Sequence, residues 1–166
     1  MPRGRPDLRI KCRKANKPIL HTHVPPPPLG VLNAQLAVAA LMAPGASWVE
    51  CHRAAEREVL AALMEAGVVV PGSSFEEMNA VHLGATFMPH GLGHLIGCDT
   101  HDVGGYVEGT PERSSHPGVG KLRTSRNMEV GMVMTSEPGC YFINALLDLA
   151  LADPSKARSV PIPCVP

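Results

Sequence analysis

Apolar residues are concentrated in two runs near the start of the chain, and each run has the spacing of a helix. Residues 31–43, rich in alanine and leucine, predict a buried helix that ends at Pro44-Gly45. A second helix is predicted after Ser47, because Glu50 follows three residues later and can complete a capping box. Gly67 stands where a left-handed residue commonly ends such a helix. The apolar residues of the second run that can form one stripe are Val49, Ala54, Leu60, Leu63 and Met64.

The same capping pattern recurs once, and the composition then changes. Ser74 and Glu77 predict a short helix that runs to about His82. Ten of the sixteen glycines lie between Gly91 and Gly139, which indicates tight turns and close backbone approaches.

Short strands are predicted in this glycine-rich part, with one helix after them. The apolar residues from Met132 to about Ser136 predict a buried strand, and residues 140–143 can restart one. Residues 145–152 predict a helix that ends at Asp153-Pro154. The predicted fold class is therefore α+β, with helices followed by antiparallel strands.

Proline content and charge set the first thirty residues apart from the rest. Residues 1–30 carry seven prolines, and the run Pro25–Pro28 favours polyproline II over a helix interior. Residues 1–23 hold seven Lys/Arg and one acid, so a leader of net charge +6 precedes a body of −6. We expect a disordered leader over 1–30, a folded domain over 31–154 and a disordered tail over 155–166.

The leader could instead be a functional arm that binds nucleic acid or an acidic surface. It has no Phe, Tyr or Trp to stack on bases, so nucleic acid is not the expected partner. The five cysteines form no CxxC pair, which indicates reduced thiols and a cytoplasmic location. No apolar run reaches the roughly 18 residues of a membrane span, so no membrane partner is expected.

The stretch "HGLGHLIGCDTHDVGG", residues 90–105, carries the densest group of chemically active side chains. His90 and His94 have the spacing of two ligands on a helix, but the glycines between them favour an extended segment. His101 is followed directly by Asp102, and such a pair suits proton transfer or polarisation of a carbonyl. On these residues alone, a functional site and a set of hydrogen-bonded structural histidines remain equally open.

Two longer motifs carry a resemblance to a known family. "FMPHGLGHLIGCDTHDVGGYVEG" and "KLRTSRNMEVGMVMTSEPGCYF" resemble Xaa-Pro dipeptidase, or prolidase, a metallopeptidase of the pita-bread fold. The similarity runs from about Val31 to Pro154. The resemblance implies a partial pita-bread catalytic domain that hydrolyses dipeptides with C-terminal proline, using two Mn²⁺ ions held by five side chains.

The resemblance also implies roles for particular residues. His94 matches the histidine metal ligand and Glu137 matches the first glutamate ligand. His90 and His101 match catalytic, substrate-side histidines, and Arg123 matches the arginine that binds the carboxylate of the substrate.

The family pattern is incomplete in this sequence. The family's two aspartate ligands and its last glutamate ligand have no counterpart here, so two of five ligands remain and at most weak binding of a single ion is expected. The N-terminal domain that helps the family to form homodimers also has no counterpart. Two interpretations follow: a working Xaa-Pro dipeptidase, or a truncated, inactive pita-bread domain that serves as a binding module or a non-functional isoform.

Overall fold

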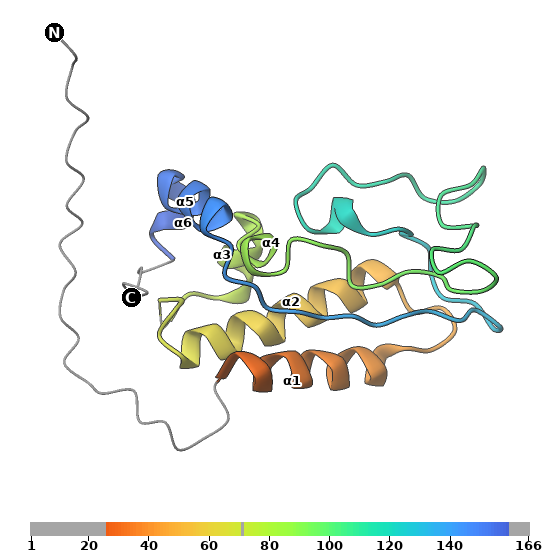
Figure 1. The fold of residues 1–166 in the computed structure, drawn as a ribbon, viewed down its shortest axis with the longest axis horizontal. Coiled ribbons are helices and arrows are strands. Elements are labelled where there is room, and N and C mark those ends of the chain that lie inside the picture. The colour runs from red at the N-terminus through yellow and green to blue at the C-terminus, as the bar shows by residue number, and fades with distance from the viewer. Residues whose placement is uncertain (1–25, 71, 160–166) are drawn as a thin grey trace, which may run out of the picture.

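The computed structural model describes residues 26–70 and 72–159 (Figure 1). Two long helices lie side by side, and the remaining short helices and loops cover one side of this pair. The elements are α1 (Pro26–Leu41), α2 (Trp48–Glu65), α3 (Phe75–Ala80), α4 (Gly84–Phe87), the 3₁₀ helix η1 (Val119–Lys121), α5 (Asn144–Ala152) and α6 (Pro154–Ala157).

Helix α1 begins five residues before the expected boundary at Val31. Its first residue is Pro26, within the proline run that we expected to be a polyproline II spacer. That expectation was wrong because proline is well tolerated in the first turn of a helix, where the backbone N–H has no intrahelical partner. Residues 1–25 of the predicted leader lie outside the described residues.

The predicted helix boundaries that depend on local capping are confirmed. The Ser47 hydroxyl accepts a hydrogen bond from the Glu50 N–H at 3.4 Å, but the Glu50 side chain does not return a bond to complete the predicted capping box. Gly67 follows α2 with φ +73°. Ser74 and Glu77 form a complete capping box at the start of α3, with bonds of 3.2 and 2.8 Å.

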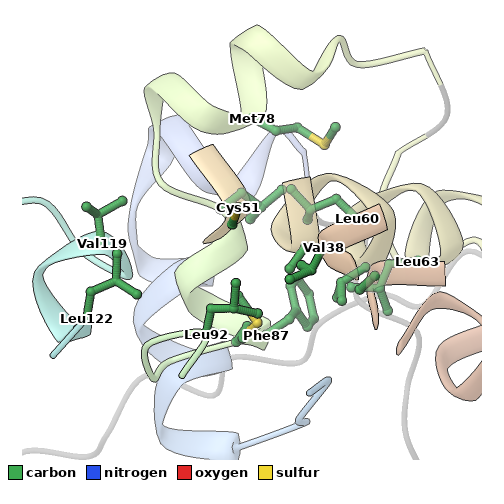
Figure 2. Close-up of a cluster of buried hydrophobic side chains, with 14 of the residues drawn as sticks. Val38, Cys51, Leu60, Leu63, Met78, Phe87, Leu92, Val119 and Leu122 are labelled. Carbon is green, nitrogen blue, oxygen red and sulfur yellow. The ribbon is translucent and has the colours of Figure 1, made fainter. Parts of the chain in front are cut away.

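The core lies between α1, α2 and the segments packed on them (Figure 2). Gly30 lets the helices approach closely, because a Cβ there would lie 2.5 Å from that of Ala62. Of the predicted α2 stripe, Leu60 and Leu63 are buried, whereas Val49, Ala54 and Met64 are only partly so. The side chains labelled in Figure 2 are Val38, Cys51, Leu60, Leu63, Met78, Phe87, Leu92, Val119 and Leu122.

The expected antiparallel strands are not formed as strands in the part of the chain that the structure describes. Residues 92–96 and 133–137 instead run antiparallel as an irregular two-stranded ribbon, with one bridge between Leu95 and Met134. Residues 140–143 are irregular too, although Tyr141 N–H bonds the Phe87 carbonyl at 2.8 Å. The ribbon has no third strand beside it in the described residues, and two strands alone give little cooperative pairing.

The C-terminal part is helical further than predicted. The helix expected over 145–152 is confirmed as α5. Asp153, where we placed the helix end, caps α6 by accepting a hydrogen bond from Ser155 N–H at 2.9 Å. Residues 155–159, predicted as part of a disordered tail, therefore include a helical turn, and 160–166 lie outside the described residues.

Helix α1 carries no charged residue and leaves leucines on the surface. Leu32 is 53% exposed and Leu36 is 60% exposed. None of the helices in the described part of the chain is long and apolar enough to cross a membrane.

Candidate metal and substrate site

The ribbon brings the two predicted metal ligands onto neighbouring positions. Glu137 N–H donates to the Leu92 carbonyl at 2.6 Å, and Thr135 N–H donates to the His94 carbonyl at 2.9 Å. The Thr135 hydroxyl also accepts a hydrogen bond from His94 N–H at 3.0 Å. In this register His94 lies opposite Thr135 and Leu92 lies opposite Glu137, so His94 and Glu137 are diagonal neighbours.

Gly93 is required for this close pairing. A Cβ at Gly93 would overlap the carbonyl oxygen of Thr135 on the facing segment. On its other side, the Gly93 carbonyl accepts a hydrogen bond from the indole N–H of Trp48, at 3.4 Å, which ties the ribbon to α2. The glycine-rich composition thus serves close backbone approach, as the sequence predicted.

His94 and Glu137 form the closest pair of candidate donors. Nε2 of His94 lies 3.0 Å from Oε1 of Glu137. The His94 side chain is 9% exposed and that of Glu137 is 53% exposed, so a nearly buried imidazole contacts a carboxylate that is open to solvent. Two ligands about 2.1 Å from one octahedral ion are themselves about 3.0 Å apart, so this spacing suits joint coordination.

The tautomer of His94 makes this contact unusual. Nδ1 of His94 lies 2.9 Å from the Leu95 carbonyl oxygen, which can only accept, so Nδ1 carries the proton. In the neutral ring the lone pair of Nε2 then points at the carboxylate of Glu137, and two acceptors face each other. A cation, either a metal ion or a second proton on the ring, is needed to make the contact favourable.

His90 lies beside this pair with an open hydrogen-bonding position. Its Nδ1 lies 2.8 Å from the Gly91 carbonyl oxygen and therefore carries the proton. Its Nε2 is buried and has no hydrogen-bond partner among the described residues. In the neutral ring this nitrogen is an acceptor, suited to an N–H group of a ligand.

His101 reaches the site without the help of its neighbour Asp102. The ring of His101 lies edge to face with the ring of His94, with centroids 4.5 Å apart. The Asp102 carboxylate accepts a hydrogen bond from Val103 N–H at 3.0 Å and lies against Gly97. Asp102 therefore makes its bonds within its own turn, and no hydrogen bond or ion pair joins it to His101 among the described residues.

A hollow of about 440 Å³ is lined by all five site residues that the sequence analysis predicted. Lys121 also faces it, and sequence reasoning missed this residue. The lining residues are Pro89, His90, Gly91, Gly93, His94, His101, Lys121, Arg123 and Glu137. The structure thus places these side chains in one concave site, while the roles assigned to them stay predictions.

The donor set fits part of a metal centre. His94 and Glu137 supply one imidazole nitrogen and one carboxylate oxygen, a mixed set that Mn²⁺ or Zn²⁺ accepts. Within residues 26–70 and 72–159, no group of three or more His, Cys, Asp or Glu side chains is arranged to hold a metal ion. Two side chains are too few to hold two ions, so the described residues do not by themselves form a dinuclear centre.

A second hollow, of about 280 Å³, lies apart from this site between α2, α3 and η1. Its wall includes His82 and His116, whose rings lie 5.0 Å apart. Burial, and then the neighbouring His116, lower the pKa of His82 from its ordinary value. Behind this wall, His52 Nε2 lies 3.4 Å from Oε1 of Glu56, and both side chains are buried.

Similarity to known proteins defines the class to which the chain belongs. Residues 30–158 match metallopeptidase family M24. The chain belongs to this family.

The individual relatives are proline-directed peptidases. The chain is 52% identical to Xaa-Pro dipeptidase of Homo sapiens over 127 residues, which is 76% of this chain and 25% of that protein. It is 38% identical to Xaa-Pro dipeptidase of Marinobacter nauticus, over 75% of this chain and 28% of that protein. The chain spans about a quarter of the length of the curated relatives it matches.

Solved structures agree with these relatives. Pseudomonas aeruginosa aminopeptidase PepP superposes with a TM-score of 0.57 at 33% identity, covering 74% of this chain and 25% of that one. Aminopeptidase P II from Yersinia pestis gives a TM-score of 0.53 at 32% identity, covering 69% and 23%. The structure therefore corresponds to a segment of the pita-bread fold, and the expected fold class is confirmed in this respect although its strands are not.

Proposed function

We propose that this chain carries part of a Mn²⁺-dependent site for hydrolysing peptides before proline. The observation that carries the proposal is the contact between Nε2 of His94 and Oε1 of Glu137 at 3.0 Å. Two acceptors at this distance call for a cation, and the relatives of the chain are metallopeptidases named for Xaa-Pro substrates. His94 and Glu137 are two of the metal ligands in this proposal.

A divalent cation bound there would polarise a carbonyl oxygen and lower the pKa of a bound water. The protein's own residues would hold the peptide around it. His90 presents a buried acceptor nitrogen to an N–H group of the peptide, and His101 stands over the ring of His94 near the scissile bond. Arg123 offers a planar guanidinium to the terminal carboxylate, which would favour dipeptides with C-terminal proline.

Donors beyond His94 and Glu137 are needed for turnover. Divalent ions in proteins commonly have three or more protein ligands, so we expect the pair to bind a single ion weakly. The metal-binding part of the proposal can therefore be tested without measuring hydrolysis.

Titration of Mn²⁺ into ¹⁵N-labelled protein tests the pair directly. Mn²⁺ is paramagnetic and broadens the signals of nearby nuclei. The amide signals of His94 and Glu137 should therefore broaden at lower Mn²⁺ concentrations than those of residues that line the second hollow. His94→Ala should remove this selective broadening, while His116→Ala, a histidine exposed in the second hollow, should leave it unchanged. The same broadening in His94→Ala as in the wild type would contradict the proposal.

A further inference from the structure

Lys121 and Arg123 belong to one short segment at the end of η1, and both residues are exposed. Leu122 between them is fully buried, with φ −58° and ψ 142°. The backbone leaves the 3₁₀ helix at Leu122, whose burial anchors the segment between two exposed neighbours. Both neighbours line the hollow that contains His94 and Glu137.

This segment is held from behind by Arg113 and Tyr106. Nη1 of Arg113 donates to the Gly120 carbonyl at 3.2 Å and also to the Leu122 carbonyl. The Tyr106 hydroxyl donates to the same Leu122 carbonyl at 3.2 Å, and the Arg113 guanidinium lies 4.2 Å from the centre of the Tyr106 ring. Two donors on one carbonyl fix the peptide plane from which Arg123 projects.

Glycines on the opposite side allow the segment to approach the histidine motif. A Cβ on Gly91 would lie 2.7 Å from the Lys121 carbonyl oxygen and 2.8 Å from the Leu122 Cα. A Cβ on Gly105 would overlap the Arg123 carbonyl oxygen. The position of both cations relative to His90 and His94 is therefore set by backbone packing on both sides.

Two cationic residues, Lys121 and Arg123, line the hollow together with one acidic residue. Glu137 is the one acidic residue that lines it, and its carboxylate is engaged with His94. Neither Lys121 nor Arg123 forms an ion pair with a described residue. Two cations without a carboxylate partner among the described residues thus line a hollow whose single acidic lining residue is in contact with His94.

We propose that Lys121 adds a second positive charge at the carboxylate position assigned above to Arg123, and that Arg113 is the positioning residue for both. The inference rests on the proposed function, in which a peptide occupies this hollow. Arg123 supplies the planar fork, and Lys121 supplies a second charge that a peptide amide cannot use. Selectivity for a free carboxylate is therefore a property of the pair.

Binding of Gly-Pro and of Gly-Pro-amide, followed by chemical shifts without added metal, tests the inference. The wild type should bind the free acid more tightly than the amide. Lys121→Gln should weaken binding of the acid about threefold and leave the amide unchanged, so that the ratio of the two affinities falls. Lys121→Arg should restore the ratio, and Lys156→Gln, the other lysine of the described residues, should not alter it.

Arg113→Gln should lower the same ratio although Arg113 does not line the hollow. If that variant fails to fold, Lys121→Gln still decides the matter, because Lys121 is exposed. If Lys121→Gln has the same ratio of affinities for the acid and the amide as the wild type, the inference is overturned and the proposed function still stands. Failure of the wild type to bind either ligand would contradict the proposed function itself, and the inference with it.

Discussion

Nε2 of His94 reaches Oε1 of Glu137 at 3.0 Å because Gly93 has no side chain between the two segments of the ribbon. We expect Gly93→Ala to separate this pair, since its Cβ would overlap the Thr135 carbonyl oxygen. The site would open while the α1–α2 core stays packed. Binding of Mn²⁺ at His94 should therefore be lost with helical circular dichroism retained.

Thr135→Val provides the comparison for this variant. It removes the hydroxyl that accepts from His94 N–H but keeps the backbone bond between Thr135 N–H and the His94 carbonyl. Its effect on Mn²⁺ binding should be the smaller of the two. Equal binding by Gly93→Ala and the wild type would show that the ribbon tolerates the added methyl group.

A second prediction concerns the buried pair of His52 and Glu56. A Cβ on Gly118 would lie 2.8 Å from Oε1 of Glu56 and 3.3 Å from Nε2 of His52, and Gly118 has φ +77°. Gly131 has a similar φ of +90° with nothing within 4 Å. Gly131→Ala should cost about 1 kcal/mol of unfolding free energy through backbone strain alone, and Gly118→Ala about twice that or more.

Urea unfolding of both variants and the wild type measures this difference. The two glycines share a similar positive φ, and Gly118 also has ψ −75°, so the excess cost at Gly118 combines backbone strain with the packing around Glu56. Equal costs would mean that the loop before η1 moves away from α2 without loss.

The third prediction concerns the pH dependence of His82. Burial is the largest cause that lowers the pKa of His82 from 6.5, and the charge on His116 is the second. The unfolded chain therefore takes up a proton near pH 6.5 that the folded chain resists, so this residue makes stability fall as the pH drops through 6.5. His116→Asn should raise the pKa of His82, and titration of its ring signals by NMR measures the change. A pKa of His82 at or above 6.5 in the wild type would refute the prediction.

The fourth prediction concerns hydrolysis by the 166-residue chain itself. Proline release from Gly-Pro in Mn²⁺ should not exceed that of His94→Ala, because the two donors found among the described residues are too few to hold two ions. Binding of the dipeptide without stabilisation of the transition state gives no turnover. Clear Mn²⁺-dependent release that His94→Ala abolishes would show that other donors complete the site.

Features set by neighbours in sequence were predictable, and features set by distant contacts were not. The capping box of Ser74 and Glu77 and the left-handed Gly67 depend on a few adjacent residues, and both are present. The strand expected over 132–136 depends on partners, and the described residues offer only one other segment to pair with. The sequence prediction placed the start of α1 too late. A run of prolines is compatible both with polyproline II and with the first turn of a helix, and its composition does not separate the two.

The candidate site was predictable only through family resemblance. Spacing alone left His90, His94 and His101 open between ligands and structural residues, and nothing local linked them to Glu137. Lys121 ends the 3₁₀ helix η1, and nothing local in the sequence linked it to the histidine motif. Arg113 could not be predicted either, because it acts through backbone carbonyls, which leave no trace in the sequence.

The arrangement of the ribbon has a consequence for the order of events during synthesis. His94 leaves the ribosome on the first segment of the ribbon, and Glu137 leaves only with the second. Helices α1 and α2 precede both and can pack while the nascent chain still grows. The His94–Glu137 pair is thus completed late, after the growing chain already presents a folded helical layer.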